Sequence, residues 1–286
     1  MGDKVAIVSD SLCCLPKEVV EQYSIRIVPV NLYFKDRVYK DWVDITPSQA
    51  YELFLKDPEG WTTSPAPPED WFETYRQLSG QTKSILCVTI SSKLSAMYNV
   101  ARQAKEQVEA EIAGIAIEVF DSRLAVTAEG LVTLAAARAA EAGKSLAEVV
   151  KAAEEMRDRV DFIFLLDTVR YIYRTGRMPK IAALAGSILN IKPLLTTSSG
   201  LVRFIGAVRS RERGIEKMLR IMEDRVGQRP VHVAVTHAYA PDEAEKLKER
   251  VLAEFNCAEL WISEFSPILG YATGTGTLGL AFYKED

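Results

Sequence analysis

Hydroxyl side chains crowd the segment TISSKLSAMYNVA at residues 89–101, directly after an apolar run at 85–88. They belong to Thr89, Ser91, Ser92 and Ser95, and a helix is expected to begin just behind them. Serines at the end of a strand can serve as a nucleophile, a phosphate cradle, a carboxylate clamp or simple helix caps. Each of these roles makes different demands on the rest of the chain.

Helix capping accounts for only part of this cluster. A strand–loop–helix unit needs one Ser or Thr at the helix start, whereas several hydroxyls occur here. A second group, in the proline-rich loop expected at 61–71, comprises Thr62, Thr63 and Ser64. Hydroxyls and helix-start amides suit an anion of low charge, and Lys93 is the only cation in these loops. A carboxylate is therefore a better ligand than a polyphosphate, which usually recruits Lys or Arg.

A serine nucleophile would need a neighbouring base. The chain has two histidines, of which His232 lies within an expected strand and His237 ends it. The sequence contains no GxSxG nucleophile elbow, and nothing in it supplies a third member for a Ser95–His237 pair. A serine-dependent acyl hydrolase therefore stays an alternative from a different functional class.

Glycines at 274, 276 and 279 spell GxGxxG near the end of the chain. A dinucleotide site needs a following helix, another strand and an acidic residue about 20 positions later. Seven residues follow Gly279, so this pattern is interpreted as a turn. The chain also lacks the GxxxxGK[ST] pattern of a phosphate-binding loop.

Composition narrows the class of protein. The 286 residues are 48% apolar and 26% charged, which is typical of a soluble globular protein with two domains. The net charge of −4 gives no electrostatic case for nucleic acid or anionic membranes. No apolar run approaches the ~20 residues of a membrane span, so stable membrane insertion is not expected. The four cysteines show no metal-like spacing and are interpreted as reduced thiols of a cytoplasmic protein.

Strands alternate with helices through the first half of the chain. Strands are expected at 5–8, 25–34, 85–90 and 115–120, and helices at 98–111 and 125–142. Thr46 with Gln49, and Ser145 with Glu148, predict capped helix starts. Alternation predicts an α/β fold with a doubly wound parallel sheet, in which ligands lie beyond the carboxyl ends of the strands. The hydroxyl clusters occupy that edge.

The chain is expected to divide near residue 160. Residues 1–160 are predicted to form the N-terminal α/β domain, with a small hairpin insertion near 30–45. Residues 161–286 are predicted to form a second, smaller α/β domain, with strands at 162–166, 232–237 and 260–265. Two helices are expected within 167–195, separated by Gly176.

Several segments together resemble one family over nearly the whole chain. They are VSDSLCCLPKEVVEQYSIRIVPVNLYF, Thr63-Ser64, ISSKLSAMY, VFDS, LLDTVRYIYRTGRMPK, GSILNIKPLL, VRSRERG and the glycine-rich tail. This set resembles the DegV family, whose members are bacterial fatty-acid-binding proteins. The resemblance implies a two-domain protein that holds a long-chain acyl group between its domains, with no cofactor, no metal and no chemistry of its own.

The resemblance also implies a set of site residues. In the family, hydroxyls matching Thr63 and Ser95 hydrogen-bond the carboxylate, and arginines matching Arg177 and Arg209 lie near the head group or a partner. Some members present the fatty acid to a separate fatty acid kinase, which makes that kinase a candidate partner. Further candidates are Ser64, Ser91, Ser92, Thr273 and Gly274, and the apolar residues within 181–195 are candidates to line the acyl tunnel.

This sequence departs from the family pattern at three places. The loop usually reads TSQPS but is Thr63-Ser64-Pro65-Ala66-Pro67 here, and the SGT turn is Ser95-Ala96-Met97. Where the family usually carries a His before TGxG, this chain has Ala272. The carboxylate ligands are retained, which favours binding, whereas the missing His argues against a kinase-linked role.

Overall fold

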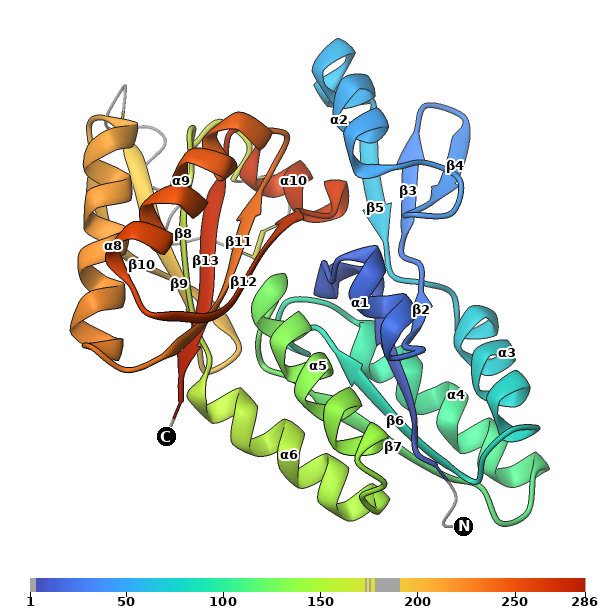
Figure 1. Cartoon of the computed structure of the whole chain (residues 1–286). Coiled ribbons are helices and arrows are strands. Elements are labelled where there is room, and N and C mark those ends of the chain that lie inside the picture. The colour runs from blue at the N-terminus through green and yellow to red at the C-terminus, as the bar shows by residue number, and fades with distance from the viewer. Residues whose placement is uncertain (1–3, 173, 175, 178–190, 286) are drawn as a thin grey trace.

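A four-stranded parallel sheet organises the N-terminal half of the chain. The computed structural model describes residues 4–172, 174, 176–177 and 191–285, and it orders this sheet β2-β1-β6-β7 (Figure 1). Its strands are β1 (Ala6–Asp10), β2 (Arg26–Val28), β6 (Ser84–Thr89) and β7 (Ala116–Asp121). The two central strands are buried along almost their whole length, because parallel sheets carry helices on both faces.

Helices cover both faces of this sheet, as a doubly wound fold requires. Helices α3 (Pro68–Ser79) and α4 (Met97–Glu111) pack together on one side, and α5 (Thr127–Glu141) and α6 (Leu146–Arg159) on the other (Figure 1). The short elements η1 (Ser11–Cys13) and α1 (Lys17–Gln22) follow β1. The parallel sheet expected from the alternation of strands and helices is confirmed.

A small antiparallel sheet projects from this domain. It consists of β3 (Asn31–Phe34), β4 (Arg37–Lys40) and β5 (Trp61–Ser64), which lie side by side in the order β4-β3-β5. Along the chain, α2 (Pro47–Lys56) and η2 (Pro58–Gly60) connect β4 to β5. The single strand expected at 25–34 is wrong, because Pro29 separates β2 from β3 and has no amide to continue a ladder. The loop expected at 61–71 is also wrong at its start, which forms β5.

The predicted helix caps are confirmed. The Thr46 hydroxyl accepts from the Gln49 amide at 3.3 Å, and the Gln49 carboxamide accepts from the Thr46 amide at 3.0 Å. Ser145 and Glu148 form the same reciprocal arrangement at the start of α6. Local sequence therefore determines where these two helices begin.

The C-terminal half forms a six-stranded mixed sheet in the order β10-β9-β8-β13-β11-β12. Its elements are β8 (Asp161–Leu165), β9 (Lys192–Ser198), β10 (Leu201–Val208), α8 (Arg211–Val226), β11 (Val231–His237), α9 (Pro241–Glu254), β12 (Cys257–Glu264), α10 (Pro267–Thr273) and β13 (Leu278–Lys284). Helices α8 and α9 cover one face (Figure 1), and α5 of the first domain contacts β11 and β13. We retain 160–161, between α6 and β8, as the proposed domain boundary.

The helix expected ahead of Gly176 is wrong within the described residues. None of residues 167–172, 174 and 176–177 is helical, and most of them form bends or turns. The Arg174 guanidinium instead lies 4.4 Å from the Tyr171 ring centroid and bonds to Glu59 of the other domain at 2.5 Å. Tertiary contacts therefore override the helical pattern here. The second expected helix falls largely on residues 178–190, outside the described residues.

Candidate ligand-binding site

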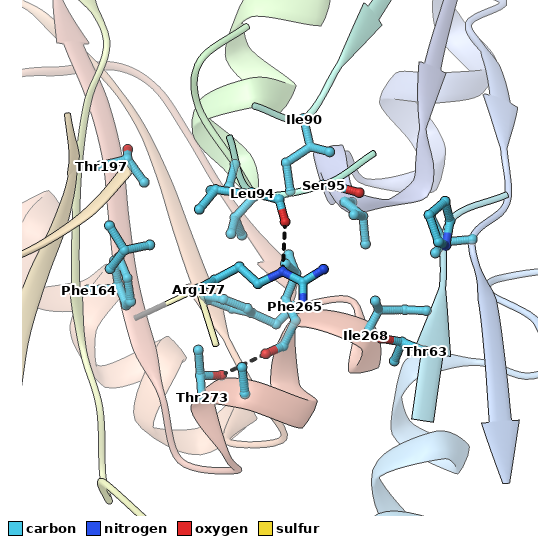
Figure 2. Close-up of a pocket in the computed structure, with 18 of the residues that line it drawn as sticks. Thr63, Ile90, Leu94, Ser95, Phe164, Arg177, Thr197, Phe265, Ile268 and Thr273 are labelled. Atoms are coloured by element: carbon cyan, nitrogen blue, oxygen red, sulfur yellow. Dashed lines mark hydrogen bonds between the residues drawn. The ribbon is translucent and has the colours of Figure 1, made fainter. Parts of the chain in front are cut away.

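A cavity of about 930 Å³, including its open mouth, lies between the two domains (Figure 2). Most of its wall is apolar, with Leu12, Ile90 and Val126 from the N-terminal domain and Phe162 and Phe265 from the C-terminal domain. A concave, largely apolar wall with a few polar groups is typical of small-molecule sites. The cavity therefore suits a ligand with a substantial apolar part.

Thr63 and Ser95 both line this cavity. Thr63 lies opposite Leu32 in the β5–β3 ladder, so pairing of two strands fixes its backbone. Among the described residues, its hydroxyl has no protein hydrogen-bond partner. Ser95 precedes α4, and its Oγ accepts from the Met97 amide over a long 3.4 Å. Both hydroxyls thus retain capacity to donate to an acceptor in the cavity.

Arg177 is the charged side chain among the described residues that line the cavity. Figure 2 shows it reaching across from the C-terminal half toward the loop that carries Leu94, and its Nε donates to the Leu94 carbonyl at 3.1 Å. Because Leu94 directly precedes Ser95 in the sequence, this contact holds the Arg177 guanidinium beside the loop that carries Ser95. The cavity therefore combines apolar walls with several hydroxyls, including those of Thr63 and Ser95, and with the positive charge of Arg177, which favours a ligand with an anionic head.

Ser91 and Ser92 are occupied by other contacts and are not among the described lining residues. The Ser91 hydroxyl donates to the Gly200 carbonyl at 2.8 Å, and Lys93 donates to Ser199 at 2.9 Å, which ties the two domains together. The Ser92 hydroxyl donates to Asp121 at 2.5 Å. The crowding of hydroxyls noted in the sequence therefore serves two purposes, interdomain contact and cavity lining.

The remaining predicted site residues are divided between the cavity and its surroundings. Ser64 and Thr273 line the cavity; Ser64 donates to the Pro65 carbonyl at 3.1 Å, and the Thr273 hydroxyl donates to the Leu269 carbonyl at 3.4 Å (Figure 2). Gly274 ends α10 with a φ of 76°, and Arg209 is exposed between β10 and α8. Neither belongs to the described lining.

Part of the wall was missed from the sequence. Phe162 and Phe164 lie two residues apart on β8, and their rings stack at 5.1 Å. Because side chains alternate across a strand, this spacing could have placed both on one face. The acyl-tunnel prediction for 181–190 lies outside the described residues. Leu194 and Leu195, from the same predicted stretch, are fully buried in β9 and belong to the hydrophobic core.

The buried carboxyl group of Asp10 supports part of the cavity wall. Asp10 is fully buried, and it accepts from the amides of Leu12 at 3.0 Å and Ile90 at 3.1 Å, two of the lining residues. Burial raises the pKa of Asp10 to about 6. Burial, followed by the nearby Asp10 charge, raises the pKa of Glu129 well above its ordinary range. Asp10 therefore positions two backbone segments of the wall.

Neither histidine lies in the described wall of the cavity. His237 is buried, its Nδ1 accepts from the Ala240 amide at 3.2 Å, and burial lowers its pKa to about 4. His232 stacks on Tyr283 at 4.5 Å and bonds to Glu259 at 2.9 Å. The geometry therefore offers no support for a Ser95–His237 hydrolase.

In the described part of the chain, no helix is both long and apolar enough to cross a membrane. No group of three or more His, Cys, Asp or Glu side chains in the same ranges is arranged to hold a metal ion.

The fold and the cavity define a two-domain α/β protein with an apolar ligand site between its domains. Residues 4–285 match the family model described as "Uncharacterised protein, DegV family". The chain belongs to the DegV family, which confirms the resemblance seen in its sequence.

Individual relatives agree with this assignment. The chain is 35% identical over 283 residues to a DegV domain-containing protein of Streptomyces coelicolor, covering 98% of each. It is similar to the structure describing fatty acid binding by a DegV family protein from Thermus thermophilus, with a TM-score of 0.90 and 26% identity over 99% of this chain and 100% of that one. A stearic-acid-binding protein from Eubacterium ventriosum gives a TM-score of 0.90 and 25% identity over 99% and 98%.

Proposed function

We propose that this protein binds one long-chain fatty acid, with the carboxylate at Thr63 and Ser95 and the acyl chain in the interdomain cavity. The proposal is supported by the similarity to DegV proteins whose structures are described as binding fatty acid or stearic acid. The observation that carries it is the placement of the Thr63 and Ser95 hydroxyls, both able to donate into the cavity, on the wall of a largely apolar space.

The energetics suit such a ligand. Burying about 14 methylenes at ~0.8 kcal/mol each contributes about 11 kcal/mol, against an association cost of ~4–15 kcal/mol. Each hydrogen bond to the charged carboxylate adds ~1.5–3 kcal/mol. The acyl chain therefore supplies most of the affinity, while Thr63 and Ser95 set its direction and select acid over ester.

Arg177 adds to this selection. Its guanidinium, anchored on the Leu94 carbonyl, adds positive charge to the cavity, where an anion is partly shielded from water. The backbone of Thr63 is fixed by strand pairing, so the donor on that side is already positioned before the ligand arrives.

We further propose binding without turnover by a cytoplasmic protein. His237 is engaged with a backbone amide rather than with Ser95, so the described structure supplies the serine with no general base. All four cysteines are free thiols, in keeping with a reducing compartment. Presentation of the fatty acid to a kinase is not part of the proposal, because Ala272 brings only a methyl group to the cavity wall.

The test is native mass spectrometry of protein purified from bacteria. We expect about one long-chain fatty acid per chain, identified after extraction by its mass. Delipidated protein should take up added palmitate or oleate to the same stoichiometry. Protein that carries no ligand and takes up neither acid would disprove the proposal, as would turnover of a chromogenic ester that depends on Ser95.

A further inference from the structure

Arg174 is a nearly buried cation near the interdomain cavity, although it does not belong to the described lining. Its side chain is only 4% exposed. It lies three residues before Arg177, the charged residue of that lining. Removing a charge from water is costly, so the surroundings of Arg174 have to compensate through specific contacts.

Three aromatic rings enclose the Arg174 guanidinium. Its central carbon lies 4.4 Å from the ring centroid of Tyr171, 5.2 Å from that of Tyr271 on α10 and 5.6 Å from that of Phe54 on α2. Each distance is within the roughly 6 Å at which a ring face attracts a cation. These rings form an aromatic cage, which is complete only when α2, α10 and the segment that carries Tyr171 are packed together.

Two oxygens of η2 complete the enclosure. Nη1 of Arg174 donates to the Pro58 carbonyl at 2.9 Å, and Nη2 donates to the Glu59 carboxylate at 2.5 Å. The Glu59 side chain is 73% exposed, so this ion pair by itself contributes little stability. A planar guanidinium can stack on rings while it bonds to two oxygens, whereas the ammonium of a lysine cannot. The enclosure therefore suits arginine, and it ties the segment that carries Arg174 to the antiparallel insertion.

The effect of this anchor on Arg177 follows from chain geometry. Three residues of extended chain span at most about 10 Å, so fixing Arg174 confines the backbone of Arg177. Gly176, between them, is exposed with a φ of 67°, and no described atom lies within 4 Å of the position that a Cβ would take. A glycine in open space restrains the chain little. Arg174 is therefore the anchor from which Arg177 reaches the Leu94 carbonyl (Figure 2).

We propose that Arg174 is a positioning residue of the ligand site, whose aromatic cage holds the chain so that the Arg177 guanidinium faces the carboxylate of the bound acid. This inference rests on the proposed binding of a fatty acid and deepens it. It assigns part of the selection of acid over ester to a residue outside the described lining, which acts only through Arg177.

A double-mutant cycle tests this role. Palmitate and its methyl ester are titrated into the delipidated natural protein, Arg174→Ala, Arg177→Ala and the double variant. Arg177→Ala should weaken palmitate binding ~5- to 10-fold and Arg174→Ala ~3- to 5-fold, with less than a twofold change for the ester. The double variant should bind palmitate at most about twofold more weakly than Arg177→Ala, because Arg174 acts through the side chain already removed.

Two more variants serve as controls. Arg170→Ala removes an exposed arginine of the same segment, whose guanidinium lies 5.4 Å from the Tyr171 ring centroid. It should leave both affinities within about twofold, because water and salt screen an exposed charge. Arg174→Lys keeps the charge but loses the stacking, and it should weaken palmitate binding ~2- to 3-fold without affecting the ester. This variant keeps the test decisive if Arg174→Ala fails to fold.

Three results would overturn the role assigned to Arg174. They are losses that multiply in the double variant, equal losses for acid and ester in Arg174→Ala, and unchanged palmitate affinity in Arg174→Lys. Failure of the proposed function has a different signature, since the delipidated natural protein would then take up no palmitate. If that protein binds palmitate and the losses multiply, only the role of Arg174 is refuted.

Discussion

Asp41 is predicted to make the stability of the protein depend on pH. Burial raises its pKa from 3.8 to about 7, opposed by hydrogen bonds from Ser266 and Ser11. Between these two values the folded state holds a proton that the unfolded state has released. Stability therefore falls as pH rises from about 4 to about 7. From pH 5 to pH 7 this amounts to about two pKa units at ~1.4 kcal/mol each, or roughly 3 kcal/mol.

The substitution Asp41→Asn should remove this contribution. The free energy of unfolding can be measured by urea titration at pH 5 and at pH 8. On going from pH 5 to pH 8, it should fall by roughly 3 kcal/mol more in the natural protein than in the variant. Asp10, whose pKa is raised to about 6, and His237, whose pKa is lowered to about 4, also contribute to the pH dependence. Comparison with the variant cancels the His237 contribution, and it cancels that of Asp10 apart from the charge coupling between Asp10 and Asp41.

A matched control uses an exposed position of the same hairpin. Asp36→Asn makes the same chemical change on the solvent-exposed turn between β3 and β4, and its stability should follow that of the natural protein at both pH values. Parallel pH curves for the natural protein and Asp41→Asn would refute the reasoning. That result would mean that Asp41 is ionised in the folded state at pH 5, despite its complete burial.

Three further predictions concern the interdomain cavity and its surroundings. Thr63→Val and Ser95→Ala should each weaken fatty acid binding ~10- to 100-fold but affect the methyl ester less; equal losses for acid and ester in titrations would make the hydroxyls structural. Ala272→His should leave fatty acid affinity within about threefold in a binding titration, but it should improve support of a fatty acid kinase in a kinase assay run in parallel. The reason is that an imidazole can stabilise developing phosphate charge. Full kinase support by the natural protein would contradict this prediction. Gly270→Ala places a methyl group against a buried tyrosine and should cost more than ~2 kcal/mol in urea titrations, whereas Gly80→Ala should be nearly neutral; similar effects would contradict the packing argument.

The sequence was informative wherever a signal is local. The alternation of strands with helices predicted the parallel sheet, and Thr46 and Ser145 marked the starts of two helices. Individual strands, helices and caps depend on residues within a few positions of each other, so the sequence shows them directly. Hydroxyls placed after strands also directed attention to the edge where Ser95 lies. Thr63 and Ser95 were selected by family resemblance, and their role remains a proposal.

Features created by distant contacts were not predicted. The strand that carries Thr63 exists because it pairs with Leu32, some 30 positions earlier, and its proline-rich flank resembles a loop. Ser91 bonds to Gly200 of the other domain, which no local pattern signals. Asp41, in a polar stretch at the end of a hairpin, gave no indication of burial, because Ser266 and the rest of its enclosure come from remote segments.

The position of β13 has a consequence for how the protein is made. This strand, the last element of the chain, lies between β8 and β11 in the middle of the C-terminal sheet, and residues 278–282 are fully or almost fully buried. During synthesis the N-terminal sheet can assemble as soon as β7 emerges. The C-terminal sheet remains split into β10-β9-β8 and β11-β12 until β13 has been synthesised. A chain that stops before β13 therefore presents two open sheet edges to its neighbours, the kind of surface on which aggregation begins.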